Sequence, residues 1–352
     1  MGKEAKIFHL ISSLRRGGRE RQLSTIIKNT DLNHKVIVFN KVEASYVDEY
    51  EISDKIVYLK NKRTLKRFFE MVKLIRTHRV NLVWSWGGFE ATFGLILSIF
   101  TNVKHINGSI RHGIVLINRK QIWRLIILQL SKFRVANSHA GLNANKLRKG
   151  YVLYNGIDDS FFIQNKDQSV SERKTINLIS VANLVPYKDY STTLEALAIL
   201  KRKKIKFHYF IVGEGPERPR IENEVKNLGL ICDVTLFGLR FDIQKLLANS
   251  DIFIHSSRGE GCSNSIIEAL AVGLPVVATN TGGTKEIIAF EYGRLFNYKD
   301  RIGLSVYLEE IILNSDLRAS MGKNAKDMAL ATFSVQSMIN HYLNIVNNVS
   351  NK

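Results

Sequence analysis

The sequence predicts an α/β protein built from two Rossmann-like, doubly wound domains that face a central cleft. Three observations lead to this prediction. The 352 residues suffice for two domains of ordinary size. Forty-five per cent of them are hydrophobic and only four are prolines, so each domain can bury a core. Short apolar runs alternate with longer amphipathic segments in both halves, which is typical of βαβ units and parallel sheets.

In the first half, apolar runs of strand length predict strands, and amphipathic stretches between them predict helices. We expect strands at 6–11, 35–39, 55–59, 81–85, 103–107 and 133–137, with helices at 18–29 and 65–78.

The second half repeats the pattern, with strands expected at 175–181, 207–212, 234–237, 252–255 and 275–278. Between the halves, residues 164–174 are polar and lack apolar periodicity, which predicts a linker. We therefore expect one domain at 1–163 and a second at 175–334. In such sheets, ligands bind at the carboxyl ends of the strands.

Charge is distributed unevenly along the chain. Residues 1–165 hold 28 Lys and Arg against 12 Asp and Glu, whereas residues 166–352 hold 23 against 20. Nucleic acid, an anionic lipid surface or an anionic substrate would each suit the basic first half.

The location of the protein is predicted from features that the sequence lacks. Two cysteines, Cys232 and Cys262, are too few for a disulfide framework or a four-thiolate zinc site. No apolar run approaches the roughly 20 residues of a membrane span, and the first residues do not resemble a signal peptide. We expect a cytoplasmic protein whose residue 1 is the mature start.

Two glutamates mark the most informative segment, residues 251–286. Glu260 falls in a loop after a strand, and Glu268 falls in the second turn of the helix that follows, for which Ser263 or Asn264 is the expected N-cap. Free N–H groups at a helix start suit a phosphate, and carboxylates accept hydrogen bonds from sugar hydroxyls. This pattern indicates nucleotide-sugar binding.

The same segment resembles glycosyltransferase family 4, whose fold is called GT-B. Its Glu-x7-Glu spacing continues into Gly-Leu-Pro-Val-Val and Thr-Gly-Gly-x-x-Glu blocks, as in that family. Five further blocks match the family and stand in the family's order before this segment: 14–23, 152–158, 180–189, 211–216 and 234–238. Together they extend the resemblance over nearly the whole chain. The resemblance implies that the domain at 1–163 binds the acceptor and the domain at 175–334 binds the nucleotide sugar. In this fold the terminal helix commonly returns to the first domain, so residues from about 335 to 352 are expected to join it.

The resemblance implies a role for each matching residue. Glu268 would hold the ribose of the donor and Glu260 the hydroxyls of the transferred sugar, while Lys188 would stabilise the leaving diphosphate as the catalytic cation. Many members have an arginine five positions before the lysine, where this chain has Asn183. Lys188 then acts alone, or a nearby arginine compensates. The candidates are Arg240, Arg15 and Arg16, and the other expected donor-binding residues are Gly17, Gly18, Ser263, Asn264 and Ser265.

In the first domain, residues 105–113 occupy the loop where family members often place a histidine or arginine facing the transferred sugar. We select His112 as a catalytic candidate, but His105, Ser109 or Arg111 could be the true equivalent. Ser109 and Arg111 are also candidates for the acceptor side.

The resemblance implies a glycosyltransferase that moves a sugar from a nucleotide diphosphate, by default UDP, with retention of configuration. The acceptor would be a lipid-linked or saccharide chain of a lipopolysaccharide, capsule or exopolysaccharide. The sequence has no Asp-x-Asp and no ligand cluster with metal spacing, so we expect no metal or other cofactor.

Two basic, apolar segments, 60–79 and 119–130, suggest docking on an anionic membrane surface at the inner face of the cell membrane. A nucleotide-sugar epimerase on the same fold is the enzymatic alternative. A basic nucleic-acid-binding protein is the other alternative, although no motif of that class is present and we expect no nucleic-acid partner.

Overall fold

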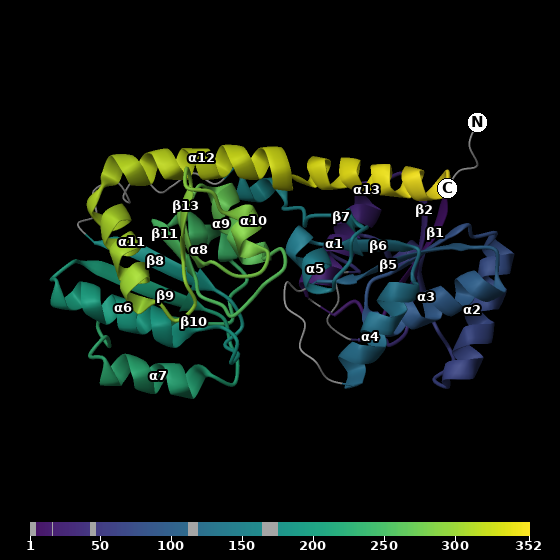
Figure 1. Cartoon of the computed structure of the whole chain (residues 1–352), viewed down its shortest axis with the longest axis horizontal. Helices are drawn as coiled ribbons and strands as arrows, with labels where there is room; N and C mark the ends of the chain where they lie inside the picture. The colour runs from purple at the N-terminus through teal and green to yellow at the C-terminus, as the bar shows by residue number, and fades with distance from the viewer. Residues whose placement is uncertain (1–4, 16, 43–46, 112–118, 164–174) are drawn as a thin grey trace. The chain divides into compact units, whose positions relative to one another are not determined.

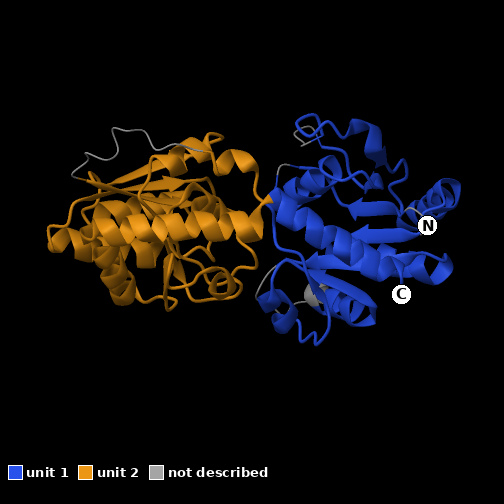
Figure 2. Ribbon diagram, turned by 90° about the horizontal axis from the view of Figure 1, so that it is seen from above, with its two compact units in different colours: residues 1–156, 335–352 blue, residues 157–334 orange. Residues whose placement is uncertain are grey.

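The computed structural model describes residues 5–15, 17–42, 47–111, 119–163 and 175–352. The chain divides into two compact units. Unit 1 contains residues 1–156 and 335–352, and unit 2 contains residues 157–334, shown blue and orange in Figure 2.

Unit 1 is an α/β unit with helices on both sides of one sheet (Figure 1). Its strands are β1 (Lys6–Ile11), β2 (Asn33–Val38), β3 (Ile56–Tyr58), β4 (Leu82–Ser85), β5 (Lys104–Ile110), β6 (Phe133–Ala136) and β7 (Tyr151–Val152). Its helices are α1 (Gly18–Lys28), η1 (Ser53–Lys55), α2 (Thr64–His78), α3 (Gly88–Phe100), α4 (Arg119–Leu130), α5 (His139–Ala144) and α13 (Val335–Ser350).

Unit 2 repeats this organisation. Its strands are β8 (Ile176–Val181), β9 (Phe207–Val212), β10 (Val234–Gly238), β11 (Ile252–His255), β12 (Val276–Thr279) and β13 (Gly293–Phe296). Its helices are η2 (Asp159–Phe161), α6 (Tyr190–Arg202), α7 (Arg218–Asn227), α8 (Ile243–Ala248), α9 (Asn264–Val272), α10 (Thr284–Ile287), α11 (Arg301–Leu313) and α12 (Ser315–Phe333).

Both sheets are parallel and share one strand order, to which unit 1 adds a seventh strand at the edge. Unit 1 follows the order β3-β2-β1-β4-β5-β6-β7, and unit 2 follows β10-β9-β8-β11-β12-β13. In each sheet the order reverses beside the first strand, between β1 and β4 and between β8 and β11. Such a reversal opens a crevice outside the carboxyl ends of the strands, which is where ligands bind. The predicted class of two Rossmann-like α/β domains is confirmed.

The sequence does not predict two short strands that the structure contains. The edge strand β7 has only two residues, too few to show a pattern. In β13, buried Arg294 interrupts the apolar run, and Glu310 of α11 pairs with its guanidinium at 3.0 Å.

The boundary between the units falls at 156–157, before the predicted linker, which lies outside the described residues. Residues 157–163 join unit 2 because Phe161 and Phe162 are buried and η2 contacts α9. At the other end of the chain, α13 buries Met338, Tyr342 and Val346 in the unit 1 core.

A chain of buried hydrogen bonds crosses that core. Trp86 Nε1 can only donate, so His9 Nδ1 accepts from it at 3.0 Å and the ring proton of His9 lies on Nε2. His9 Nε2 then donates to His34 Nδ1 at 3.1 Å, and His34 Nε2 donates to Thr30 Oγ1 at 2.7 Å. The hydroxyl of Thr30 donates to Ile26 O at 2.7 Å. Every partner has a fixed role, and both imidazoles are neutral.

Candidate functional site

In unit 2, the loops after β8 and β11 meet at the point where the strand order reverses. Asp189 N donates to Ser256 O at 3.1 Å, and Arg258 N donates to Tyr187 O at 2.9 Å. Lys188 lies between these bonds and forms an isolated bridge with Ser257. The backbone of one loop therefore fixes the other, and Lys188 is held where the two join.

Three ionisable side chains converge there. The Lys188 ammonium donates to Glu260 Oε1 and lies 3.2 Å from His255 Nε2. Ser257 Oγ lies 3.2 Å from the same carboxylate oxygen. Lys188 and His255 are buried, and the Glu260 side chain is 15% exposed. The structure thus brings together two of the catalytic residues predicted from sequence, Lys188 and Glu260.

The electrostatics of this cluster favour an ionised glutamate and a neutral histidine. Burial raises the pKa of Glu260, but the Lys188 ammonium, which donates to this carboxylate, outweighs burial and holds that pKa well below its ordinary value. Burial, followed by the charge of Lys188, lowers the pKa of His255. At neutral pH the site therefore presents an ammonium and a carboxylate beside a neutral imidazole.

A glycine loop supports the backbone of Glu260. Gly283 N donates to Glu260 O at 2.7 Å, and Gly282 has φ +51 in the left-handed region. A Cβ on Gly282 would lie 2.2 Å from Glu260 O, so no larger residue fits without moving this loop. The Gly-Gly pair of the sequence motif thus has a structural role in placing Glu260.

Helix α9 starts a few residues after Glu260. Ser263 is its N-cap residue, although its side chain makes no capping bond and instead lies 3.3 Å from Ser265 Oγ. Asn264 is the first helical residue, and Glu268 is buried in the second turn, as the pattern predicted. Ser263, Ser265 and Asn264 therefore stand at the start of the helix that carries Glu268.

The other predicted donor-binding residues of unit 2 lie on neighbouring loops. Asn183 is exposed in the loop after β8. Arg240 is exposed after β10 and pairs with Asp242 at 2.6 and 2.8 Å. Its guanidinium is thus engaged by a carboxylate two residues away and is not part of the Lys188 cluster.

In unit 1, the predicted phosphate-binding glycines stand at the start of α1. Gly17 is the N-cap and Gly18 the first helical residue. A Cβ on Gly17 would lie 2.6 Å from Glu20 Oε2, so the Glu20 carboxylate lies beside this helix start. Arg19 pairs with Glu20 at 2.6 Å. The Glu20 carboxylate therefore already provides negative charge at the start of α1. Of the two arginines predicted to compensate for Asn183 from this loop, Arg15 is exposed and Arg16 lies outside the described residues.

The candidates around β5 have different environments. His105 is buried, with Nε2 2.9 Å from Ser85 Oγ, and burial lowers its pKa to about 3. Ser109 is half-buried on the same strand, and the Arg111 guanidinium lies over the Trp86 ring, 4.8 Å from its centroid. His112 lies outside the described residues. Of the described candidates, Ser109 and Arg111 are nearest the carboxyl end of the strand, and His105 belongs to the core.

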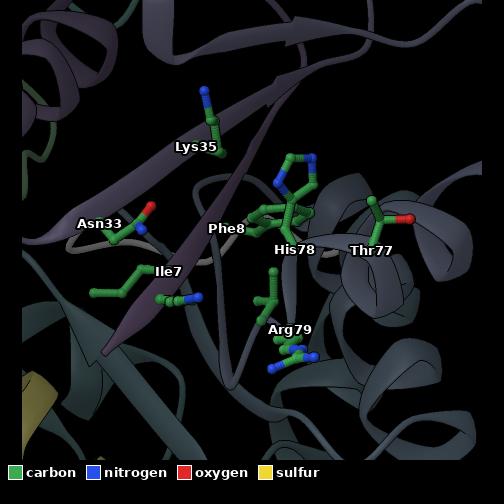
Figure 3. Close-up of a pocket in the computed structure, with 9 residues that line it drawn as sticks. Ile7, Phe8, Asn33, Lys35, Thr77, His78 and Arg79 are labelled. Atoms are coloured by element: carbon green, nitrogen blue, oxygen red, sulfur yellow. The ribbon is translucent and has the colours of Figure 1, made fainter. Parts of the chain in front are cut away.

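A hollow of about 340 Å³ lies at the opposite, amino end of β1 and β2 (Figure 3). Basic side chains line part of it, including Lys35, His78 and Arg79. The Lys35 amino group points away from His78 and Arg79 in Figure 3 and donates to Asp54 O at 2.9 Å. This hollow is remote from the strand ends that carry the predicted site residues of unit 1.

The described part of the chain lacks two features, a metal-binding group and a membrane-spanning helix. Its His, Cys, Asp and Glu side chains form no group of three that could hold a metal ion. None of its helices has the length and apolar character needed to cross a membrane.

Sequence reasoning missed His255 and Ser257, which complete the cluster around Lys188 and Glu260. One signal was available, because His255 ends a predicted strand five residues before Glu260. His255 lies beside Lys188, 67 residues earlier, because β11 neighbours β8, and this strand order could not be predicted from the residue types.

Comparison with known proteins agrees with this geometry. Residues 162–328 match the family model described as Glycosyl transferases group 1. The chain is 25% identical over 224 residues to N-acetyl-alpha-D-glucosaminyl L-malate synthase of Bacillus anthracis, covering 62% of this chain and 58% of that protein. It is 27% identical over 170 residues to the lipopolysaccharide core biosynthesis glycosyltransferase LpsE of Rhizobium meliloti, covering 48% and 49%. The matches thus span about half the length of these two relatives.

Among solved structures, that of Anabaena Alr3699/HepE in complex with UDP superposes with a TM-score of 0.84 at 21% identity. The match covers 97% of this chain and 100% of that one. The fold is therefore the GT-B fold, and together the matches support the GT-B glycosyltransferase superfamily.

Proposed function

We propose that this protein is a glycosyltransferase that transfers a sugar from a nucleotide diphosphate, UDP by preference, to a hydroxyl of a lipid-linked or saccharide acceptor. One observation carries the proposal. A buried ammonium, Lys188, and a partly exposed carboxylate, Glu260, meet at the strand reversal of unit 2, beside the helix that carries Glu268. The UDP bound to Alr3699/HepE and the matched family model support the same reading.

In the proposed reaction, the bond between the anomeric carbon and the diphosphate breaks while the acceptor hydroxyl attacks the same face of the sugar. The departing phosphate oxygen takes the proton of that hydroxyl, and configuration is retained. Lys188 neutralises the charge that develops on the diphosphate. Glu260 accepts hydrogen bonds from sugar hydroxyls and Glu268 from the ribose. Because Lys188 supplies the positive charge, we propose that transfer needs no resident metal or other cofactor.

We propose cell-surface polysaccharide assembly as the biological setting. LpsE is a lipopolysaccharide core glycosyltransferase, and its match to this chain supports this setting. In unit 1, exposed apolar side chains gather on α2 and α3, where Leu65 is 69%, Phe69 61% and Phe100 67% exposed. Phe68 joins the two helices with its ring 5.8 Å from that of Phe100.

Basic side chains, among them Arg63 and Lys66, are exposed near these apolar groups. This combination suits docking on anionic lipid headgroups, where a lipid-linked acceptor would be met. We therefore propose a cytoplasmic protein that acts at the inner face of the cell membrane.

The test is ligand-dependent thermal stability. A nucleotide sugar at 100 times its dissociation constant should stabilise the protein by about 2.7 kcal/mol, and a panel of donors will identify the one that binds. Glu268→Ala should abolish this stabilisation and sugar transfer, while the control Glu291→Ala, at an exposed position of the same unit, should retain both. Unchanged transfer by Glu268→Ala would contradict the proposal, and sugar inversion without an acceptor would indicate an epimerase.

A further inference from the structure

We infer that His255 is a positioning residue that fixes the Lys188 ammonium for the leaving diphosphate. The inference rests on the proposed function. It assigns a role to a side chain that reaches the reaction only through Lys188.

His255 is rigidly placed. It is the last residue of β11, a strand flanked by β8 and β12, and it is 3% exposed. Its backbone pairs with Ala278, and its carbonyl lies 3.3 Å from Thr279 Oγ1. The ring stacks on that of Phe253, with centroids 6.2 Å apart and planes 17° apart. A side chain so confined can serve as a fixed reference point for a flexible lysine.

The direction of the hydrogen bond follows from chemistry. An ammonium can only donate, so His255 Nε2, 3.2 Å away, accepts and its ring proton lies on Nδ1. Nε2 is also 3.7 Å from Glu260 Oε1, beyond hydrogen-bond distance. His255 therefore interacts with the cluster chiefly as an acceptor for Lys188.

The residues beside the ammonium are held by their own hydrogen bonds. Tyr209 OH donates to Ser180 Oγ at 2.6 Å, and Ser180 Oγ donates to Ile254 O at 2.6 Å. A hollow of about 10 Å³ adjoins the cluster and is lined by residues that include Lys188, His255, Ser180, Tyr190 and Tyr209. Such a volume holds one water molecule at most, so it offers the Lys188 ammonium little free space.

The Lys188 ammonium donates to Glu260 and to His255, and the proposed reaction changes only the first of these hydrogen bonds. Glu260 stands on a loop and, in the proposed reaction, turns its oxygens to the hydroxyls of the sugar. His255 stands on a strand and stays in place. When Glu260 engages the sugar, His255 is the protein contact that keeps Lys188 aimed at the diphosphate. Without His255, the ammonium would keep its hydrogen bond to Glu260 and its place over the Tyr187 ring, and the Lys188–Glu260 pair would compete with the donor.

The test compares three variants of the full chain. His255→Leu removes the acceptor, His255→Gln returns an oxygen acceptor at similar reach, and Phe207→Leu is the control for a lost buried ring, at the amino end of β9 in the core of the same unit. We expect His255→Leu to lower kcat/KM for the donor by about 10- to 100-fold, the range typical when a metal ligand loses the hydrogen-bond partner that orients it. His255→Gln should recover most of this loss, and Phe207→Leu should keep wild-type kcat/KM at a reduced Tm.

The pH profile gives a readout that a merely structural role would not change. The charged or titratable groups facing His255 are Lys188, Glu260, Tyr190 and Tyr209. In acid, a proton on Nε2 would replace the accepted hydrogen bond with repulsion of Lys188. The wild type should therefore lose activity on an acidic limb that is absent or moved to lower pH in His255→Gln.

Equal kcat/KM in His255→Leu and Phe207→Leu would overturn the inference, as would a His255→Gln variant no better than His255→Leu. Both results require an active wild type and leave the proposed function standing. A wild type that neither binds nor turns over any donor of the panel would overturn both proposals.

Discussion

Acid should destabilise unit 1 through the buried imidazoles of its core. Burial, and then the charge of Lys55, lowers the pKa of His34 from 6.5 to about 4. Above about pH 7 neither state binds a proton at this ring. Between these two pKa values the unfolded chain binds a proton that the folded chain refuses, so the free energy of unfolding falls as the pH falls. At 1.36 kcal/mol per pKa unit, the loss reaches about 3 kcal/mol below pH 4 and about 2 kcal/mol at pH 5.

The three tryptophans, Trp84, Trp86 and Trp123, all lie in unit 1, so urea unfolding followed by their fluorescence reports on this unit. His34→Gln cannot titrate in this range. Between pH 7 and pH 5 its free energy of unfolding should fall by about 2 kcal/mol less than that of the wild type. His78→Gln, at an exposed position, should keep the wild-type dependence. Equal pH dependence in wild type and His34→Gln would refute the assignment of a neutral, buried imidazole.

Two further predictions test the packing of unit 2 and the surface of unit 1. Gly213→Ala should lower stability by more than about 2 kcal/mol in thermal unfolding, because φ is +141 and the new Cβ would lie 2.0 Å from Ala182 O. Gly229→Ala, at φ +69 with nothing within 4 Å, should cost about 1 kcal/mol, and equal losses would contradict this account. Changing both Leu65 and Phe69 to Ser should weaken the sedimentation of the protein with anionic vesicles. The control Phe241→Ser changes an exposed apolar residue of unit 2 and should leave sedimentation unchanged. Equal vesicle binding by the double variant and the control would argue against docking through α2.

Much of the fold could be predicted because parallel strands are buried on both faces and appear as continuous apolar runs. The bounds expected for β1, β9 and β11 match those of the structure. Prediction failed where burial comes from pairing and not from apolar character. Arg294 is buried inside β13, where Glu310 on the helix that follows pairs with its guanidinium and the carbonyl of Phe290 accepts from it.

The candidate site could be predicted in part for a different reason. Glu260, Glu268 and the Gly282–Gly283 pair are close in sequence, so their spacing carries information. Contacts between distant loops leave no such trace. The approach of His255 to Lys188 depends on β11 lying next to β8, and the Glu20 carboxylate beside Gly17 depends on a side-chain rotamer. Neither can be read from residue types.

The arrangement around Lys188 explains why a fold of this kind can hold opposite charges ready for a substrate. Burying an ion pair costs desolvation energy that the pair itself does not always repay. Here backbone hydrogen bonds help to hold the pair in place. Gly283 N donates to the Glu260 carbonyl, and the carbonyls of Ser256 and Tyr187 accept the hydrogen bonds that join the two loops. These bonds place the charges before any ligand arrives, so an incoming diphosphate need not order the loops. The ionised state of Glu260 then depends on Lys188 as much as the aim of Lys188 depends on His255. Lys188, Glu260 and His255 therefore act as one unit. Substitutions at these three residues should have non-additive effects on the affinity of the protein for its donor.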